Sequence, residues 1–463
     1  MLQGRSKPPF APLKRNLLTI PGKAGAYLRS TDTDVLVINQ PIAFRVEGDE
    51  QALRYKEELA NWLLTDEAVP LFFDDELGRV YYAVVNNTID DFERISILRK
   101  GTITFVCLDP YAYSTQQKTQ MLNSDINIVL NEGTADTYPN FEATVINPIT
   151  HLDIVAENGY MRIGQPIEAD QTPFVKEQLI LRDTMATLTG WTSASDVDGG
   201  VVAGEMYSDG AATFRAQSYG TGSQWHGPAV KKSLSEQLQD FQIDVYMTLK
   251  TTEVTEAGRV EIYLLDVNNN RIGKLSLKDM LVGADNTMGE IRIGPLQGGH
   301  YLIQTHGVRP GLWNNFYGIL RLRREGNQLQ AYIAMIDTQN GSQHHTRWNE
   351  IYVDVEEKYL TRLAQIQVHI GQYADRHWVR DIGVHEIRVW KINQQQGIPY
   401  IAQPGDQIIV DHKTNNILIN GESRIDLKDF GASYFPLKKG YNFIGYSPAD
   451  DVDMTIKWRE RFK

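Results

Sequence analysis

The sequence predicts a mainly β protein of three domains, in which one β domain is interrupted by another. Three observations predict this fold. Strand-like alternation stops near Ile163 and resumes after Pro404. The long passage between these points carries many short strand-like runs separated by turn residues, as in a sandwich or jelly roll. A clear helical pattern occurs before residue 64, and the helical signal vanishes from about Asn131 onward.

Residues 1–130 are expected to form a β-rich domain with one helix. Strand-like runs at 34–38 and 42–46 precede the helix, and another at 80–84 follows it. Asp49 is a good N-cap residue, and Pro70 prevents extension past the helix exit. The apolar residues that recur at helical spacing are Ala52, Tyr55, Leu59, Trp62 and Leu63.

Residues 131–166 and 404–463 are expected to fold together as one discontinuous β-sandwich. Two strand-like runs, 408–410 and 417–419, flank a turn rich in Asn, which is a hairpin signal. The last strand alternates apolar residues (Val452 to Trp458) with polar ones, a half-buried pattern. Neither piece alone has enough strands to bury an apolar face. Because chain ends lie close together at loop tips, an insertion there disturbs little core.

Residues 167–403 are then the inserted domain, a β-sandwich or jelly roll. Six of the eight tryptophans of the chain lie in it. Trp191 and Trp390 lie in strand-like surroundings, which indicates core positions.

Composition excludes several classes of protein. A chain of 463 residues suggests roughly three domains of about 150 residues each. The net charge of -12 argues against a binder of the phosphate backbone of nucleic acids, which needs clustered Lys and Arg. Cys107 is the single cysteine, which excludes an intramolecular disulfide framework, and its alternating strand predicts a buried thiol. No signal peptide and no apolar run long enough for membrane insertion occur, so we expect synthesis in the cytosol.

The outer framework resembles a family of phage proteins, the distal tail proteins (Dit) of long-tailed siphophages. The resemblance covers about the first 165 and the last 60 residues, and it depends on the order and spacing of several short motifs. These are the helix ending Trp62–Leu64, then Arg99–Phe105 leading to Asp109–Tyr111, then Asn131–Thr134 with Tyr138–Pro139, and Tyr434–Leu437 before Lys439–Asn442.

The resemblance implies a structural protein of the virion, located at the tail tip and made in the host cytoplasm. It implies an N-terminal belt domain that forms a hexameric ring, followed by a galectin-like β-sandwich. Partners would be the tail tube protein, a tail-associated tip or receptor-binding protein, and cell-wall saccharide of a Gram-positive host. The inserted domain resembles the carbohydrate-binding modules of extended members of this family.

Enzyme and metal motifs in the chain are incomplete. A Gly220–Gln224 run begins like a dinucleotide loop, but Trp225 stands where a small residue is needed. His385-Glu386 lacks the second histidine of a zinc protease. Asp266–Asn270 imitates a calcium loop without its glycine and glutamate, and a β-turn is the better interpretation. We therefore expect no catalytic residue, cofactor or metal site.

Aromatic residues beside polar ones are the candidate binding groups of the inserted domain. Sugars stack their C–H faces on aromatic rings, while polar side chains bond their hydroxyls. The candidate carbohydrate-binding residues are Trp225, His226, Trp313, Asn314, Tyr317, Arg347, Trp348, Tyr373, Asp375 and Trp378. Each of these tryptophans is also a natural core residue of a large sandwich, so the sequence alone leaves both roles open.

Two other functions for the inserted domain remain open from sequence. It could be a glycan-cleaving enzyme, which predicts two carboxylates facing each other at glycosidase separations. It could instead be a docking platform for other baseplate proteins, in which case the aromatic residues would be covered in the assembled tail.

Overall fold

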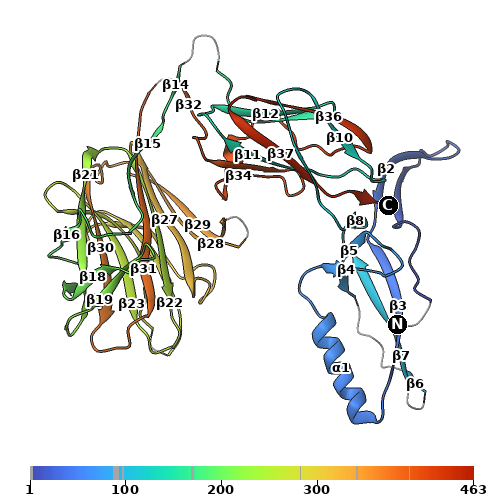
Figure 1. The fold of residues 1–463 in the computed structure, drawn as a ribbon, viewed down its shortest axis with the longest axis horizontal. Helices are drawn as coiled ribbons and strands as arrows, with labels where there is room; N and C mark the ends of the chain where they lie inside the picture. The colour runs from blue at the N-terminus through green and yellow to red at the C-terminus, as the bar shows by residue number, and fades with distance from the viewer. Residues whose placement is uncertain are drawn as a thin grey trace. The chain divides into compact units, whose positions relative to one another are not determined.

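The computed structural model describes residues 4–86, 93–95, 98–167, 172–281, 283–339, 342–395 and 397–463. The chain divides into two compact units, drawn in Figure 1. We call the first the framework unit, which comprises Met1–Gln165, Ala402–Ile419 and Arg424–Lys463. The second is the inserted unit, Pro166–Ile401 with Asn420–Ser423.

The first part of the framework unit is an antiparallel sheet in the order β3-β7-β5-β8-β38, with β4 beside β5 and β6 beside β7. The last strand of the chain, β38, thus completes a sheet built from N-terminal strands. Cys107 lies in its core and is fully buried, as predicted, and burial raises the pKa of its thiol to about 11. A separate hairpin, β1-β2, precedes the sheet. The strands are β1 (Leu13–Leu18), β2 (Tyr27–Thr33), β3 (Leu36–Arg45), β4 (Val69–Leu71), β5 (Arg79–Val85), β6 (Glu93–Ile95), β7 (Leu98–Cys107), β8 (Ala112–Ser114) and β38 (Arg461–Phe462).

Helix α1 (Asp49–Leu63) covers part of this sheet. Gly48, not Asp49, occupies the N-cap position, so the predicted cap was wrong by one residue. Leu59 and Leu63 pack against a small apolar cluster of the sheet. Trp62 is 67% exposed, contrary to the prediction. Residues four apart share a helix face, so Leu59 and Leu63 occupy the buried face and Trp62 projects beside it.

The rest of the framework unit is a β-sandwich built from both sides of the insertion. One sheet has the order β10-β36-β12-β13, and the other includes β34-β33-β11-β37-β9. Phe141 of β11 pairs with Val410 of β33 on one side and with Ile456 of β37 on the other. The strands are β9 (Lys118–Met121), β10 (Asn127–Asn131), β11 (Asn140–Val145), β12 (His151–Ala156), β13 (Gly159–Gly164), β33 (Gln407–Asp411), β34 (Asn416–Ile419), β36 (Gly440–Ser447) and β37 (Val452–Trp458), with the short 3-10 helix η1 (Ile425–Leu427).

The hairpin β33-β34 turns at Asn415, which has the left-handed φ of 55° that asparagine tolerates. The two ends of the insertion are held by consecutive residues. Thr150 accepts a hydrogen bond from the Gln165 N–H (3.0 Å), and the Ile149 N–H donates to the Ala402 carbonyl (3.2 Å). The chain therefore leaves and re-enters the sandwich at neighbouring points.

The inserted unit is a larger sandwich of two mainly antiparallel sheets, in which β17 and β20 form a parallel pair. One has the order β18-β19-β31-β22-β27-β28-β29 with β15 beside β31, and the other has the order β16-β21-β30-β23-β24-β25-β26 with β20 beside β30 and β17 beside β20. Its strands are β14 (Pro173–Phe174), β15 (Glu177–Asp183), β16 (Thr192–Ser193), β17 (Gly200–Val202), β18 (Glu205–Ser208), β19 (Phe214–Ser218), β20 (Trp225–Gly227), β21 (Ala229–Leu238), β22 (Phe241–Lys250), β23 (Gly258–Leu265), β24 (Arg271–Asp279), β25 (Met288–Ile293), β26 (His300–Thr305), β27 (Phe316–Glu325), β28 (Gln328–Asp337), β29 (Gln343–Val353), β30 (Leu363–Tyr373), β31 (Asp381–Ile392), β32 (Ile398–Pro399) and β35 (Glu422–Ser423).

One large apolar core lies between these two sheets, with Val245 of the first and Leu264 of the second in the same cluster. Trp191 belongs to it and is 8% exposed, as predicted. Trp390 does not belong to it and is only half-buried. Since Val389 is fully buried and neighbouring strand residues point to opposite faces, Trp390 lies on the outer face of its sheet, and its predicted core position was wrong.

Candidate functional site

Two of the predicted aromatic–polar clusters come together at one place in the inserted unit. Trp225 of β20 pairs with Tyr373 of β30, and their rings meet edge to face with centroids 5.2 Å apart. A second aromatic pair, Tyr219 and Trp378, has centroids 6.0 Å apart. Both pairs join segments 219–225 and 373–378, and we call these four residues the aromatic cluster.

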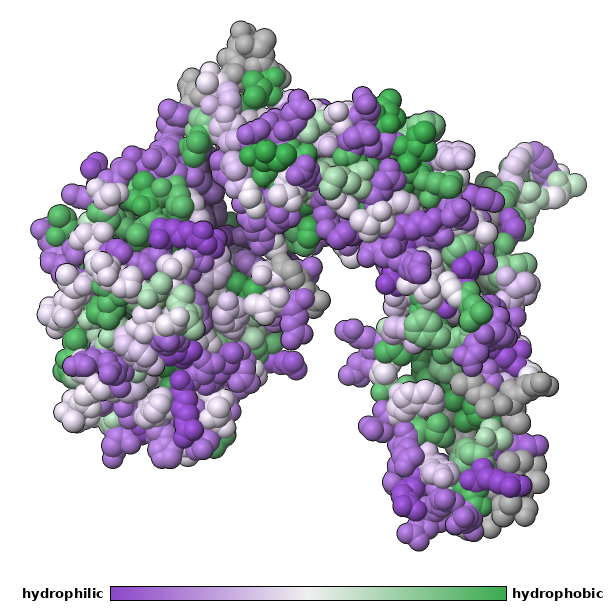
Figure 2. Space-filling view, in the orientation of Figure 1, coloured by the Kyte–Doolittle hydropathy of each residue, from purple (hydrophilic) through white to green (hydrophobic). Residues whose placement is uncertain are grey.

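The aromatic cluster is partly exposed to solvent. Trp378 is 48% exposed, and the other three rings are half-buried. Asp375, Arg376 and His377 precede Trp378 and are exposed. Figure 2 shows apolar residues on the visible surface of the inserted unit only in scattered patches among hydrophilic ones. A half-exposed tryptophan beside a carboxylate, a guanidinium and an imidazole offers both a stacking surface and hydrogen-bonding groups.

Arginine side chains hold two rings of the aromatic cluster. The guanidinium carbon of Arg259 lies 4.8 Å from the centroid of Trp225, and that of Arg376 lies 5.0 Å from the centroid of Tyr373. Each such contact stabilises a ring orientation by about 0.5–2 kcal/mol. Two rings of the cluster are thus held in place before any ligand arrives.

Two other candidates are too deeply buried to bind a sugar. Trp313 is fully buried in the core, where its indole N–H donates to the Thr346 carbonyl (3.1 Å). His226 is 2% exposed, and its Nδ1 lies 2.9 Å from the Gln224 carbonyl oxygen. The prediction was wrong for both residues. Trp313 lies in a short turn between long strands, and a tryptophan there can also fill the core of the sandwich. His226 lies on the same strand as Trp225, but its side chain points inward.

Asn314 and Tyr317 follow Trp313 and have structural contacts. The Asn314 side chain accepts a hydrogen bond from the Thr287 N–H (3.0 Å) and donates one to the Asp285 carbonyl (2.8 Å). The Tyr317 ring packs against His385 at 5.2 Å between centroids. Tyr317 lies on β27, in the sheet that does not contain β20 and β30.

Arg347 and Trp348 lie on β29, the edge strand of that same sheet. Arg347 is exposed, whereas Trp348 is half-buried against the core, and its indole N–H donates to Glu350 (3.0 Å). The structure therefore does not bring these two residues together with the aromatic cluster.

Charged residues lie buried on the face of the β23-β24-β25 sheet that points away from the core. We call Asp198, Arg259, Glu261, Lys274, Glu290 and Arg292 the buried ionic network. The Lys274 ammonium contacts Glu290 (2.6 Å) and Glu261 (3.2 Å), and Arg292 contacts Asp198 (2.8 Å). A segment around Val197 packs over this face, so all six residues are at most 5% exposed.

The protonation of this network does not suit glycoside hydrolysis. Burial disfavours the charge of Glu261, but Lys274 and Arg259 outweigh that effect and lower its pKa to about 2. The pKa of Glu290 is also lowered, because Lys274 and Lys278 outweigh the effect of burial. A glycosidase needs one carboxyl group with a raised pKa to protonate the leaving group. Neither Glu261 nor Glu290 has that property.

Sequence reasoning missed the buried ionic network and part of the aromatic cluster. In β23, charged Arg259 and Glu261 alternate with apolar Val260 and Ile262, a pattern usually read as a solvent-facing strand. The segment around Val197, about sixty residues earlier in the chain, covers this face of the sheet. The charged residues are therefore buried and do not face solvent. Tyr219 gave no local signal, because only the pairing of two distant segments places it beside Trp378.

The excluded motifs have structural roles. Asp266 closes the turn between β23 and β24, accepting hydrogen bonds from the N–H groups of Asn268 and Asn270 (both 2.8 Å). His385 and Glu386 lie within strand β31. Within the described ranges, no three His, Cys, Asp or Glu residues are arranged to hold a metal ion. No helix in that part of the chain is long and apolar enough to span a membrane.

Solved structures give only distant likenesses. The CBM2 module of the evolved Dit of Lactobacillus casei BL23 phage J-1 is 15% identical, with a TM-score of 0.40, over 48% of this chain and 98% of the module. The Dit protein of phage SPP1 is 12% identical, with a TM-score of 0.38, over 100% of this chain and 93% of that one. A β-glucanase of Bacillus licheniformis is 8% identical, with a TM-score of 0.29, over 47% of this chain and 99% of the enzyme. A search of curated proteins finds no match.

Family models match both ends of the chain. Residues 2–107 match the phage tail protein RIFT-related domain. Residues 381–462 match the C-terminal domain of the siphovirus-type tail component. The two matches lie in the order that the resemblance in sequence predicts, one on the N-terminal sheet and the other mainly on the strands after the insertion. The chain therefore carries domains of siphophage tail proteins at both ends, in agreement with the predicted resemblance to the Dit family.

Proposed function

We propose that this chain is the hub of a phage tail tip. Six copies would form a ring through the N-terminal domain and join the tail tube to the tip or receptor-binding proteins. The support is the match of both ends of the chain to family models, since both models describe tail components. A closed ring requires one surface of each copy to fit a different surface of the next.

The inserted unit, in this proposal, binds host cell-wall saccharide during adsorption. The observation that carries this part is the aromatic cluster, where half-exposed rings lie beside exposed Asp375, Arg376 and His377. Single sugar contacts are weak. Several copies on one ring raise the effective concentration, so avidity could exceed the affinity of one site by about a hundredfold or more.

The proposed role is adhesion without catalysis. The low pKa of Glu261 and the lowered pKa of Glu290 argue against an acid–base pair on the charged face of the inserted unit. Incubation of the full chain with Gram-positive wall polysaccharides should release no reducing ends. Release of reducing ends would instead favour the glycan-cleaving alternative.

Binding of the full chain to immobilised Gram-positive wall polysaccharides tests the adhesion role. Trp378→Ala should weaken binding by about tenfold or more, because stacking on one ring contributes roughly 1–2 kcal/mol. Trp390→Ala is the matched control, since Trp390 is a partly exposed tryptophan on the other sheet. Equal binding by both variants would contradict a role for the aromatic cluster in adhesion.

A footprint of assembled tails separates adhesion from protein docking. Trp378 should be oxidised by hydroxyl radicals as readily in intact particles as in the isolated chain, because a saccharide site must stay open. Protection of Trp378 in the particle would favour the docking platform and contradict the saccharide site.

A further inference from the structure

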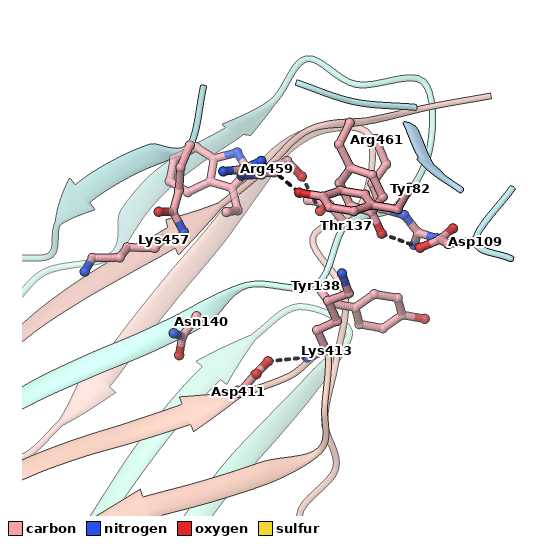
Figure 3. Close-up of a pocket in the computed structure, with 13 residues that line it drawn as sticks. Tyr82, Asp109, Thr137, Tyr138, Asn140, Asp411, Lys413, Lys457, Arg459 and Arg461 are labelled. Carbon is pink, nitrogen blue, oxygen red and sulfur yellow. Dashed lines mark hydrogen bonds and ion pairs between the residues drawn. The ribbon is translucent and has the colours of Figure 1, made fainter. Parts of the chain in front are cut away.

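The framework unit contains a polar pocket that neither the tail role nor the aromatic cluster explains. Its volume is about 490 Å³, within the range of pockets that bind small ligands or single side chains. Figure 3 shows its labelled residues, which come from the N-terminal sheet and from the sandwich. The lining comprises Tyr82, Asp109, Tyr113, Gln117, Thr137, Tyr138, Asn140, Asp411, Lys413, Lys457, Trp458, Arg459 and Arg461.

Both acidic residues of the pocket already have partners within the chain. Asp411 accepts hydrogen bonds from the Lys413 N–H (2.7 Å) and the Thr414 hydroxyl (2.7 Å), which close the β33-β34 turn. Asp109 accepts hydrogen bonds from Arg461 (3.0 Å) and from the Tyr113 hydroxyl. These carboxylates are therefore committed to the fold.

Two buried donors in the pocket wall have no acceptor. The indole N–H of Trp458, a residue 5% exposed, has no hydrogen-bond partner, and neither does the Nε–H of Arg461. The side-chain oxygen of Asn140 also lacks a donor. A buried polar group left unsatisfied costs about 1–3 kcal/mol, so these atoms favour an incoming group with complementary atoms.

Four basic and two acidic residues line the pocket, and two of the cations are already paired, Lys457 with Glu142 (2.6 Å) and Arg461 with Asp109 (3.0 Å). Arg459 donates to the Tyr82 hydroxyl (3.3 Å), and the Lys413 ammonium lies 4.9 Å from the centroid of Tyr113. Neither has a carboxylate within ion-pair distance among the residues the structure describes. The guanidinium of Arg461 is fixed 4.1 Å from the centroid of Tyr111. The pocket thus presents fixed positive charge and unfilled donors together.

We propose that this pocket binds the carboxylate of an aspartate or glutamate in an extended segment of a protein partner. A carboxylate supplies acceptors for Trp458, Arg461 and Arg459, and a peptide N–H supplies the donor for Asn140. Gln117 on the pocket rim immediately precedes β9, which is the edge strand of its sheet. An extended peptide can pair with such an edge while its side chain enters a pocket.

The Trp458 indole signal in proton–nitrogen correlation spectra of the full chain tests this proposal, with Trp458→Phe assigning the signal. The probe is the peptide Ac-Gly-Asp-Gly-amide, with Ac-Gly-Asn-Gly-amide as its uncharged match and glucuronic acid as a saccharide carboxylate. The acidic peptide should move the signal saturably, with a Kd on the order of 1–10 mM. The asparagine peptide should leave the signal in place.

Charge-removing variants complete the test. Lys413→Met combined with Arg459→Met should weaken binding of the acidic peptide by about tenfold, because charge-assisted hydrogen bonds are stronger than neutral ones. Lys439→Met removes an exposed lysine of the same unit outside the pocket and should not alter the Kd. No saturable shift, an unchanged Kd in the double variant, or a response to glucuronic acid without one to the peptide would each overturn the proposal. The result is independent of saccharide binding by the inserted unit.

Discussion

The buried ionic network of the inserted unit and the pocket of the framework unit use similar residues in opposite ways. In the network, Lys274 touches two carboxylates and Arg292 touches Asp198, so the charges are opposed within the chain. In the pocket, the cations of Lys413 and Arg459 have no carboxylate within ion-pair distance among the residues that the structure describes. The difference indicates that the network serves the fold, whereas the pocket is suited to a partner from outside.

The largest expected effect follows from Lys274→Met. Loss of the ammonium leaves Glu261 and Glu290 buried without their shared cation. Breaking a buried ion pair in this way costs about 3–5 kcal/mol. Urea unfolding of the full chain, followed by tryptophan fluorescence, should show the transition of the inserted unit at much lower denaturant.

Lys358→Met is the control for that change, because Lys358 is an exposed lysine paired with Glu356 at the surface. It should leave the midpoint unchanged. A midpoint for Lys274→Met equal to that of the control would show that the network contributes nothing to stability.

The pH dependence of stability gives a second, smaller effect. His369 is fully buried, and burial together with nearby Arg259 lowers its pKa to about 4 against the opposing effect of Glu261. The unfolded chain binds this proton near pH 6.5, the folded chain only near pH 4. Stability is therefore fully present above pH 6.5 and falls as pH drops toward 4, by on the order of 2–3 kcal/mol.

Thermal unfolding of the inserted unit at pH 7.5, 6, 5 and 4.5 measures this loss. His369→Gln should flatten the profile between pH 6.5 and 4. His412 in the framework unit also has a pKa lowered to about 4, so it provides an internal reference that the substitution leaves in place. An equally steep profile in the variant would assign the effect to other groups.

Gly200→Ala should disturb the segment that covers the network. An added Cβ would lie 2.5 Å from the Trp225 carbonyl oxygen and 2.9 Å from the Arg259 guanidinium, so the strand must shift. Overpacking of this kind costs about 1–3 kcal/mol. Gly445→Ala is the control in thermal unfolding, because open space surrounds that position. Equal melting temperatures of the two variants would mean that the covering segment accommodates the added methyl group without loss of stability.

The smallest expected effect is in the pocket. Lys413→Met removes a cation that has no carboxylate partner among the described residues, so stability should change by less than about 0.5 kcal/mol. Binding of the acidic peptide should nevertheless weaken. A large loss of stability would place Lys413 with the structural charges of the network and remove the contrast between the two regions.

Much of the framework could be predicted from local sequence patterns. Alternation of apolar residues gave the half-buried strand that ends at Trp458, and Asn415 marked the β33-β34 turn. Both signals are local, since alternation and turn chemistry depend on residues only a few positions apart. The same local signal failed at Trp62, where the choice of helix face depends on the sheet beneath it.

The candidate site was only partly predictable. Trp378 and Trp313 both lie among polar residues in sequence, yet one is 48% exposed and the other fully buried. Pairing between β20 and β30 decides which aromatic residues meet, and this pairing joins segments about 150 residues apart. The pocket was missed for the same reason, because its wall combines residues from both ends of the chain.

The two hydrogen bonds at Ile149 and Thr150 have a consequence for how such a tail protein can diversify. Since adjacent residues hold both ends of the insertion, removal of everything between Gln165 and Ala402 leaves a gap that a short turn can bridge. The framework sheets need not change when one inserted domain is exchanged for another. Evolution can therefore replace the inserted domain while keeping the framework strands on either side of it.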